Sequence, residues 1–400
     1  MRETILQASL LLASQSVRLV GPGLAMLLLA RYWAPSDYGG FAAAFALASL
    51  LGLLPAAGFS AWLLDRSARR PEAVPPMLVR ALAAQALLTA PMLAVAYAAA
   101  RMLNLAPVDL TLTLTLTAAL TGAGDIAVAA LRAQKFEQPV ALAAIPANLT
   151  LLGGILVWHG SGALAIAMLW GLVRFGQSLA LGYAAWRSLP PSTRDDPASQ
   201  VRLREALPFI ASQMPGILYG QIDTILVRLA LGDAGAGLYN AALRLLMLAS
   251  FAAQSLAQWF QPRLAGIAAG SQPWLALRRH LRLCLGAVAT AGLMTFTMLA
   301  PQVLAILYGP AYADASGALT VAGFVLAARC FVAAQWIELT ALRFETHRAR
   351  DAWLLLGMFC ALALPFGWAA GGAGVMMAHQ LALGPIAALS GRSLARARQN

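Results

Sequence analysis

Charged side chains are scarce in this 400-residue chain, and their scarcity excludes an ordinary soluble protein. Only 11% of the residues are charged, whereas 60% are hydrophobic; soluble domains carry roughly 25% charged residues. Lysine is almost absent, since Lys135 is the only one and the other basic residues are arginines. The composition therefore predicts an integral membrane protein with a formal net charge of +12.

Motifs of enzymes, metal centres and nucleotide binding are also missing. The sequence has no Walker loop, no nucleophile elbow and no His, Cys and Glu cluster at metal-ligand spacing. We interpret the three cysteines, Cys284, Cys330 and Cys360, as small core residues. The basic residues are scattered in short loops, unlike a nucleic-acid-binding patch. We expect no enzyme activity, no catalytic residues, and no cofactor, metal or nucleic-acid partner.

Long hydrophobic runs dominate the sequence. A membrane-spanning helix needs about 20 apolar residues, and the runs predict an all-α protein with twelve spans. We place these near residues 6–30, 38–63, 78–100, 109–131, 139–158, 162–186, 206–230, 237–259, 282–306, 315–340, 352–369 and 372–390.

Arginine is distributed unevenly between the loops on the two sides of the membrane. Most basic residues, from Arg2 through the Arg187–Arg204 loop to the tail, fall on one side, whereas the opposite loops hold only Arg31 and Arg101. Loops rich in Lys and Arg stay in the cytoplasm. Both termini are therefore expected to be cytoplasmic, in a multi-pass protein of a bacterial inner membrane.

The two halves of the chain resemble each other at an offset of about 197–198 residues. The segment Ala30–Phe41 is similar to Val227–Leu238, because in both a helix ends, a tight turn follows and a small-residue helix begins. Six helices per half predict two parallel repeats with a site between them. We predict bundles at 1–186 and 205–391, a cytoplasmic linker at 187–204 and a basic tail at 392–400.

Three segments resemble one known family. They are the turn Trp33–Phe41, the stretch Gln221–Arg244 with Gln261–Leu264 after it, and Pro301–Tyr312. Together they are similar to the polysaccharide-biosynthesis flippases, which are oligosaccharide-lipid exporters of the multidrug/oligosaccharidyl-lipid/polysaccharide (MOP) superfamily. The resemblance runs along most of the chain through loose motifs. It implies a MATE-like, V-shaped pair of six-helix bundles that opens alternately to each side and moves undecaprenyl-pyrophosphate-linked oligosaccharides to the outer leaflet.

Several charged residues fall inside the predicted spans, where a charge costs at least about 2.5–3.5 kcal/mol unless it faces a partner or a wet cavity. Arg18, Arg174 and Arg329 lie near the middle of their helices. A guanidinium holds phosphate oxygens bidentately, so we predict that these three attract the pyrophosphate-sugar headgroup. The alternative is that each pairs with a buried acid or with helix-end carbonyls.

We predict different roles for the remaining ionisable residues of the predicted spans. Asp125 either binds a coupling ion or acts as the counter-ion of an arginine. Asp223 and Arg244 lie at similar depth on one hairpin, which predicts a structural ion pair. We expect Glu338 to be solvated near the cytoplasmic interface and His379, in the last span, to be packed or hydrogen bonded.

The sequence thus predicts a flippase for a lipid-linked oligosaccharide that serves O-antigen, capsule or exopolysaccharide assembly. Its expected partners are that cargo, the membrane lipids, and a polysaccharide polymerase or ligase. A drug/cation antiporter of the same fold is the first alternative. A membrane polymerase or ligase is the second, and it would need a large outer loop that we do not find.

Overall fold

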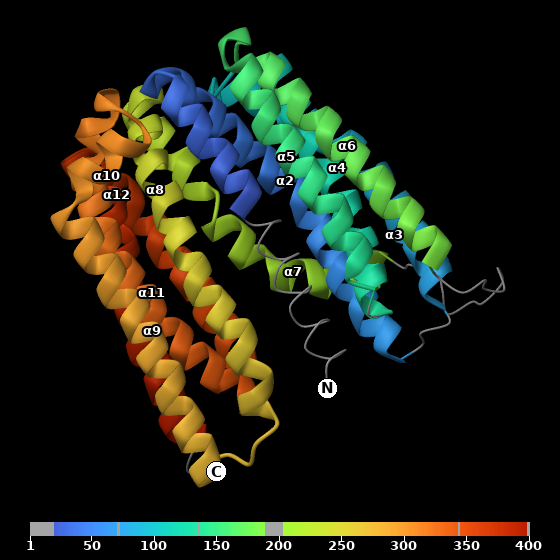
Figure 1. The fold of residues 1–400 in the computed structure, drawn as a ribbon, viewed down its shortest axis with the longest axis vertical. Coiled ribbons are helices and arrows are strands. Elements are labelled where there is room, and N and C mark those ends of the chain that lie inside the picture. The colour runs from blue at the N-terminus through green and yellow to red at the C-terminus, as the bar shows by residue number, and fades with distance from the viewer. Residues whose placement is uncertain (1–19, 70–72, 135, 189–202, 343–344, 398–400) are drawn as a thin grey trace. The chain divides into compact units, whose positions relative to one another are not determined.

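The computed structural model of the protein describes residues 20–69, 73–134, 136–188, 203–342 and 345–397. Every regular element in these ranges is a helix (Figure 1). Helices suit a bilayer because all their backbone hydrogen bonds are satisfied within one segment. The predicted all-α membrane fold is confirmed.

The helices form two compact units. The first unit contains Met1–Tyr32 and Gly40–Ile225, and the second contains Trp33–Gly39 and Leu226–Asn400. The first turn of α2 (Pro35–Arg69) therefore belongs to the second unit, although the rest of that helix belongs to the first.

In the first unit, α4 packs against α3 and α6, and α5 packs against α6. Its core is made of apolar side chains such as Phe59, Trp62 and Ile126. Its helices are the apolar segment Val20–Tyr32, most of α2, α3 (Val74–Leu103), α4 (Val108–Ala133), α5 (Gln138–Trp158), the short η2 (His159–Ser161), α6 (Ala163–Ser188) and α7 (Leu203–Tyr219).

In the second unit, α11 packs against both α9 and α12. The α8 helix (Ile222–Ala265) enters this unit at Leu226. The further elements are α9 (Gln272–Met298), α10 (Ala300–Leu307), η4 (Pro310–Ala315), α11 (Ser316–Ala341) and α12 (Glu345–Ala397).

Two of the longest helices are broken at glycines. Non-helical backbone interrupts α8 at Gly232 (φ 72°) and α12 at Ala370 and Gly371 (φ 59° at the glycine). Positive φ is available to glycine because it has no Cβ. These breaks divide the helices where the sequence predicted the turns between spans seven and eight and between the last two spans.

Two predicted spans were wrong. The span predicted over 206–230 is interrupted, because α7 ends at Tyr219, residues 220 and 221 form a turn, and α8 begins at Ile222. The other was wrong at its boundaries. We predicted a helix over 282–306, but α9 begins at Gln272 and ends at Met298, and the separate α10 follows. The side chain of Ser271 caps the start of α9 by accepting a hydrogen bond from the backbone N–H of Trp274. Arg278, Arg279 and His280, which precede the predicted span, therefore belong to α9.

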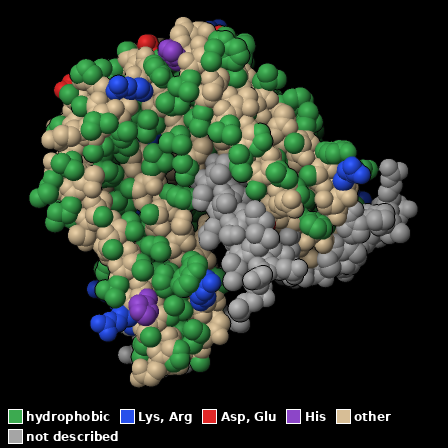
Figure 2. Space-filling view, in the orientation of Figure 1, with side chains coloured by type: hydrophobic (Ala, Val, Ile, Leu, Met, Phe, Trp, Pro, Cys, Tyr) green, Lys and Arg blue, Asp and Glu red, His purple; other side chains and the backbone are tan. Residues whose placement is uncertain are grey.

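The described surface is rich in exposed apolar side chains. Nine described segments are long and apolar enough to span a membrane. Leu87, Leu149 and Leu172 are each at least 65% exposed in the middle of such helices. Figure 2 shows a mainly hydrophobic face with few, separated charges. This pattern is that of helices surrounded by lipid, and the protein is a multi-pass membrane protein.

The helix α7 packs with the first unit. Ala206 lies in that unit's core cluster, and Glu205 forms an ion pair with Arg66 of α2 at 2.8 Å. A Cβ on Gly58 of α2 would lie 2.9 Å from the Cα of Ile210. The units thus divide the chain after α7, whereas we predicted a linker before it; the 187–204 linker, which lies almost wholly outside the described residues, stays a prediction.

Candidate functional site

Arg174 is the predicted headgroup-binding arginine whose surroundings are best defined. Its side chain is buried on α6. One guanidinium nitrogen donates to Oε1 of Gln177 at 2.6 Å, and another donates to Oδ1 of Asn148 on α5 at 3.2 Å. A Cβ on Gly21 would lie 2.8 Å from the amide nitrogen of Asn148, so helix 20–32 also packs at this point. Three helices of the first unit therefore meet around Arg174.

The described structure does not test whether the other two predicted cations lie near Arg174. Arg18 lies outside the described residues. Arg329 is partly buried on α11, in the second unit. A headgroup site formed by all three arginines stays a prediction.

The predicted acids also lie in separate surroundings. Asp125 is partly buried on α4. Asp223 is buried and accepts hydrogen bonds from the backbone N–H and the hydroxyl of Thr224, at 2.6 and 3.3 Å. Arg244 is buried and donates from Nε to Oδ1 of Asn240 at 3.0 Å. Asp223 and Arg244 belong to different units, so their ion pair stays a prediction, as does a coupling role for Asp125.

Most residues of the sequence segments that carry the family resemblance lie in the second unit. We refer to Tyr38, Asn240, Arg244, Tyr308 and Tyr312 together as the aromatic cluster. Asn240 Oδ1 accepts hydrogen bonds from both the Tyr38 hydroxyl, at 3.0 Å, and Arg244. Tyr308 donates to the carbonyl of Ala241, and Tyr312 donates to the carbonyl of Trp33.

The rings of the aromatic cluster also touch one another. The Tyr308 and Tyr312 rings are 5.3 Å apart, and the Tyr38 and Tyr312 rings are 6.3 Å apart. Buried hydroxyls and rings in such an arrangement hold segments rigidly, because each polar group would be costly to leave unpaired. The cluster therefore fixes the first turn of α2 onto the second unit. Sequence reasoning found the segments but not their common role.

A close crossing of two helix starts lies beside this cluster. A Cβ on Gly237 would lie 2.7 Å from the carbonyl carbon of Pro35 and still closer to its oxygen. A Cβ on Gly39 would meet the carbonyl of Asp233 in the same way. The two contacts are equivalent at an offset of 198 residues, which is the offset of the repeat seen in the sequence. Only glycine fits at either position, so the crossing requires both.

Glu338 is where a sequence prediction was wrong. We expected it to be solvated, but it is fully buried on α11. Its two oxygens accept hydrogen bonds from the Nε atoms of Arg278 and Arg282 on α9, both at 2.9 Å. A buried carboxylate needs such partners. The basic start of α9 supplies them.

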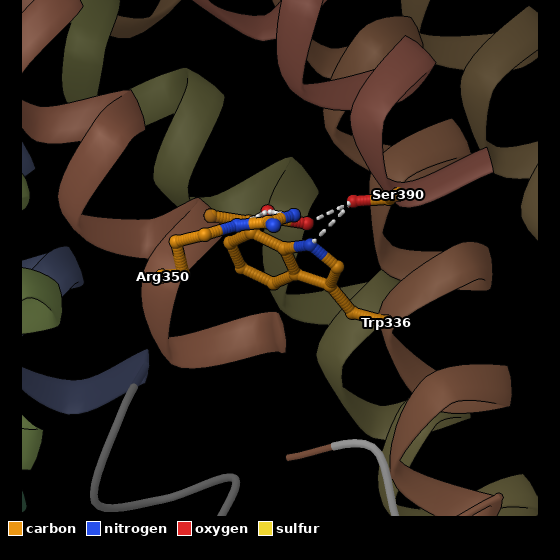
Figure 3. A network of polar contacts seen from close by, with 4 residues as sticks. Trp336, Arg350 and Ser390 are labelled. Carbon is orange, nitrogen blue, oxygen red and sulfur yellow. Dashed lines mark hydrogen bonds and ion pairs between the residues drawn. The ribbon is translucent and has the colours of Figure 1, made fainter. Parts of the chain in front are cut away.

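A second buried carboxylate, Asp351, joins the two parts of α12 to α11. It accepts hydrogen bonds from Ser390 at 2.7 Å and from Arg350 at 2.9 Å, and Ser390 also accepts one from the indole N–H of Trp336 at 3.2 Å (Figure 3). Glu338 and Asp351 thus both lie in networks with arginine. Among the described residues, no three His, Cys, Asp or Glu side chains gather as a metal site.

Solved structures define the class of this fold. An inward-facing multidrug resistance MATE family transporter of the MOP superfamily matches with a TM-score of 0.74 and 16% identity, over 96% of each chain. The lipid II flippase MurJ, in an inward closed conformation, matches with a TM-score of 0.73 and 14% identity, over 97% of this chain and 87% of its own. A MOP superfamily transporter from Pyrococcus furiosus matches at 0.63 and 16%, over 98% and 95%. The chain has the fold of MOP-superfamily membrane transporters.

A family model then places the chain more closely. The model described as polysaccharide biosynthesis protein matches residues 7–267, which is more than half of the chain. The protein belongs to this polysaccharide biosynthesis family, as its sequence segments indicated. A search of the curated proteins finds no match.

Proposed function

We propose that this protein is a flippase for polyprenyl-pyrophosphate-linked oligosaccharide. It moves the cargo from the cytoplasmic to the outer leaflet of the inner membrane by alternating access, with both termini in the cytoplasm. Membership of the polysaccharide biosynthesis family carries this proposal, since a transporter fold within that family has a glycan-lipid as its natural cargo. Export then feeds the polymerase or ligase that assembles O-antigen, capsule or exopolysaccharide.

The chemistry of the buried cations supports an anionic headgroup. A pyrophosphate offers several oxygens to a planar guanidinium, which can hold two of them at once. Arg174 already donates to two neutral amide oxygens, those of Asn148 and Gln177. Exchanging a neutral acceptor for a charged phosphate oxygen gives a stronger hydrogen bond at the same donor. In this proposal Arg174 exchanges these two acceptors for oxygens of the headgroup, and Arg18 and Arg329 also attract the headgroup.

The main alternative is a drug/cation antiporter. The similarity to the inward-facing MATE transporter is the observation that favours it. A cationic drug would need acids to receive it, whereas the buried acids Glu338 and Asp351 of the second unit are already paired with arginines. A polymerase or ligase is less favoured, because the outer loop between α3 and α4 is only a few residues long. We propose that the chain itself catalyses no reaction.

A deletion strain tests the cargo. We expect loss of surface polysaccharide together with accumulation of intact polyprenyl-pyrophosphate-linked oligosaccharide, restored by the wild-type chain. Glycan analysis of the accumulated lipid then identifies the repeat unit. Normal surface polymer with altered sensitivity to cationic drugs would contradict the proposal and favour the antiporter.

A further inference from the structure

The second unit contains a buried histidine that plays no part in the proposed headgroup binding. His379 lies on α12, eight residues after the break at Gly371. At 1.5 Å per residue it is about 12 Å along the helix from that break, which is near the middle of a bilayer core of about 30 Å. The side chain is fully buried. An ionisable residue at this depth marks a functional site by default.

Two aromatic residues define the surroundings of His379. Its Nε2 atom is 3.1 Å from the hydroxyl oxygen of Tyr239 on α8. Its ring stacks on Phe359, from the first part of α12, with centroids 4.0 Å apart and planes 16° apart. Tyr239 and Phe359 are themselves fully buried. The imidazole is therefore held in one orientation by three helical segments.

The Tyr239 hydroxyl can accommodate both protonation states of this imidazole. A tyrosine hydroxyl can donate or accept a hydrogen bond, whereas Nε2 accepts in one neutral tautomer and donates in the imidazolium. When a proton from water binds the Nε2 lone pair, the hydrogen bond can reverse, so that Nε2–H donates to the tyrosine oxygen. The tyrosine O–H then loses its acceptor, and water that reaches the exposed pair can accept this hydrogen bond instead. Loss of the Nε2 proton to water restores the first arrangement.

Two other buried ionisable groups of the second unit do not offer this freedom. Glu338 and Asp351 are held by arginines, so protonating either carboxylate would break an ion pair. Tyrosine and cysteine ordinarily titrate far above neutral pH, whereas histidine titrates near it. Tyr239 is a titratable group that shares a hydrogen bond with His379. Among the helices around the pair, α8 carries Arg244, five residues after Tyr239, and α12 carries Asp351, eight residues before Phe359. The helix α11, which packs against α12, carries Arg329.

We infer that His379, paired with Tyr239, is the proton-binding site through which the second unit couples cargo movement to a proton gradient. The inference rests on the proposed flippase function and names its coupling ion. In the packing described here the pair is shielded from water. The second unit must therefore expose it to one side of the membrane for the proton to bind and to the other side for the proton to leave.

Proteoliposomes that contain the purified full-length protein test the coupling. The probe is the polyprenyl-pyrophosphate-linked oligosaccharide extracted from the deletion strain, and an external glycosidase reports its distribution between leaflets. With the membrane potential clamped and a pH difference of 2 units, one proton per cargo supports a leaflet ratio of roughly 100-fold, because each pH unit is tenfold in proton activity. We expect wild-type protein to approach this ratio and His379→Gln to equilibrate the cargo to a ratio of about 1.

Matched variants and outcomes separate this inference from the flippase itself. His280→Gln is the control, because His280 is exposed at the start of α9, and it should behave as wild type. Cargo that accumulates normally with His379→Gln would overturn the proton site and leave the flippase standing. So would wild-type protein that moves cargo but ignores the pH difference.

A second measurement decides the case in which His379→Gln does not fold or wild-type protein moves no cargo. Nuclear magnetic resonance of protein labelled at histidine nitrogen follows the His379 signal with pH. We expect reversible titration whose midpoint moves in Tyr239→Phe by up to about one pH unit, the roughly 2- to 10-fold effect of one hydrogen bond. A signal that does not titrate between about pH 5 and 9 would overturn the inference even if the flippase function had also failed.

Discussion

The crossing of α2 and α8 gives the sharpest test of how the second unit is held together. In Gly237→Ala the added methyl group would overlap the backbone carbonyl of Pro35. A backbone carbonyl cannot rotate away as a side chain can, so the two helix starts have to separate. Overpacking of this kind costs typically 1–3 kcal/mol, and we place this contact at the upper end.

The magnitude must allow for helix propensity. Alanine is favoured over glycine inside a helix by about 1 kcal/mol, which offsets part of the clash. We expect Gly237→Ala to lose about 2 kcal/mol of unfolding free energy. Gly286→Ala on α9 is the matched control, because nothing lies within 4 Å of its added Cβ. That variant should gain roughly 0.5–1 kcal/mol.

A double-mutant cycle adds a second test of the same contact. Gly39 and Gly237 face each other's helix starts, so once one substitution has separated the helices, the other should cost less than it does alone. Reversible denaturant unfolding in mixed micelles measures all four proteins, and the apparent melting temperature serves as a second readout. Gly237→Ala that is as stable as Gly286→Ala would refute the close crossing.

Three further predictions concern the buried charges. Glu338→Gln removes the counter-charge of Arg278 and Arg282 and should cost about 3 kcal/mol of unfolding free energy. The control Glu205→Gln, whose pair with Arg66 is exposed, should cost less than about 1 kcal/mol. Equal losses for the two variants would contradict the burial of Glu338. Arg174→Ala should abolish complementation of the deletion strain at normal protein abundance, whereas Arg187→Ala, at the exposed end of α6, should complement fully. Normal export by Arg174→Ala would argue against a role of Arg174 in headgroup binding. A reporter fused within 189–202 should be cytoplasmic, and an outer location would overturn the arginine-based orientation.

The sequence was sufficient to predict most of the membrane fold. Apolar runs and glycine turns are local signals, so most of the spans and the breaks at Gly232 and Gly371 could be predicted. The turn at residues 220 and 221 was not predicted. The start of α9 was placed too late because Arg278, Arg279 and His280 lower the hydropathy of its first part. Ser271, a good helix cap, with a proline at position 273 was the signal that could have located the start of α9.

The candidate site was less predictable, because its partners are distant in sequence. Glu338 was expected to be solvated because it lies near the predicted cytoplasmic end of a span, and its arginine partners are 56 and 60 residues away in the sequence. The Tyr38–Asn240 hydrogen bond joins residues separated by 202 positions. Arg174 was identified as an intramembrane cation, but nothing near it in the sequence points to Asn148, 26 residues earlier. Composition reveals that a buried charge needs a partner, and only the packing identifies which one.

The most direct test of the central claim is the leaflet in which the lipid-linked oligosaccharide lies. Spheroplasts of the deletion strain, with and without the restored gene, are treated with an external glycosidase before the lipid is extracted. The account predicts cargo that is protected from the enzyme without the protein and becomes accessible when it is restored. Single repeat units that are fully accessible in the deletion strain would contradict it, because the cargo would then have crossed the membrane without this protein.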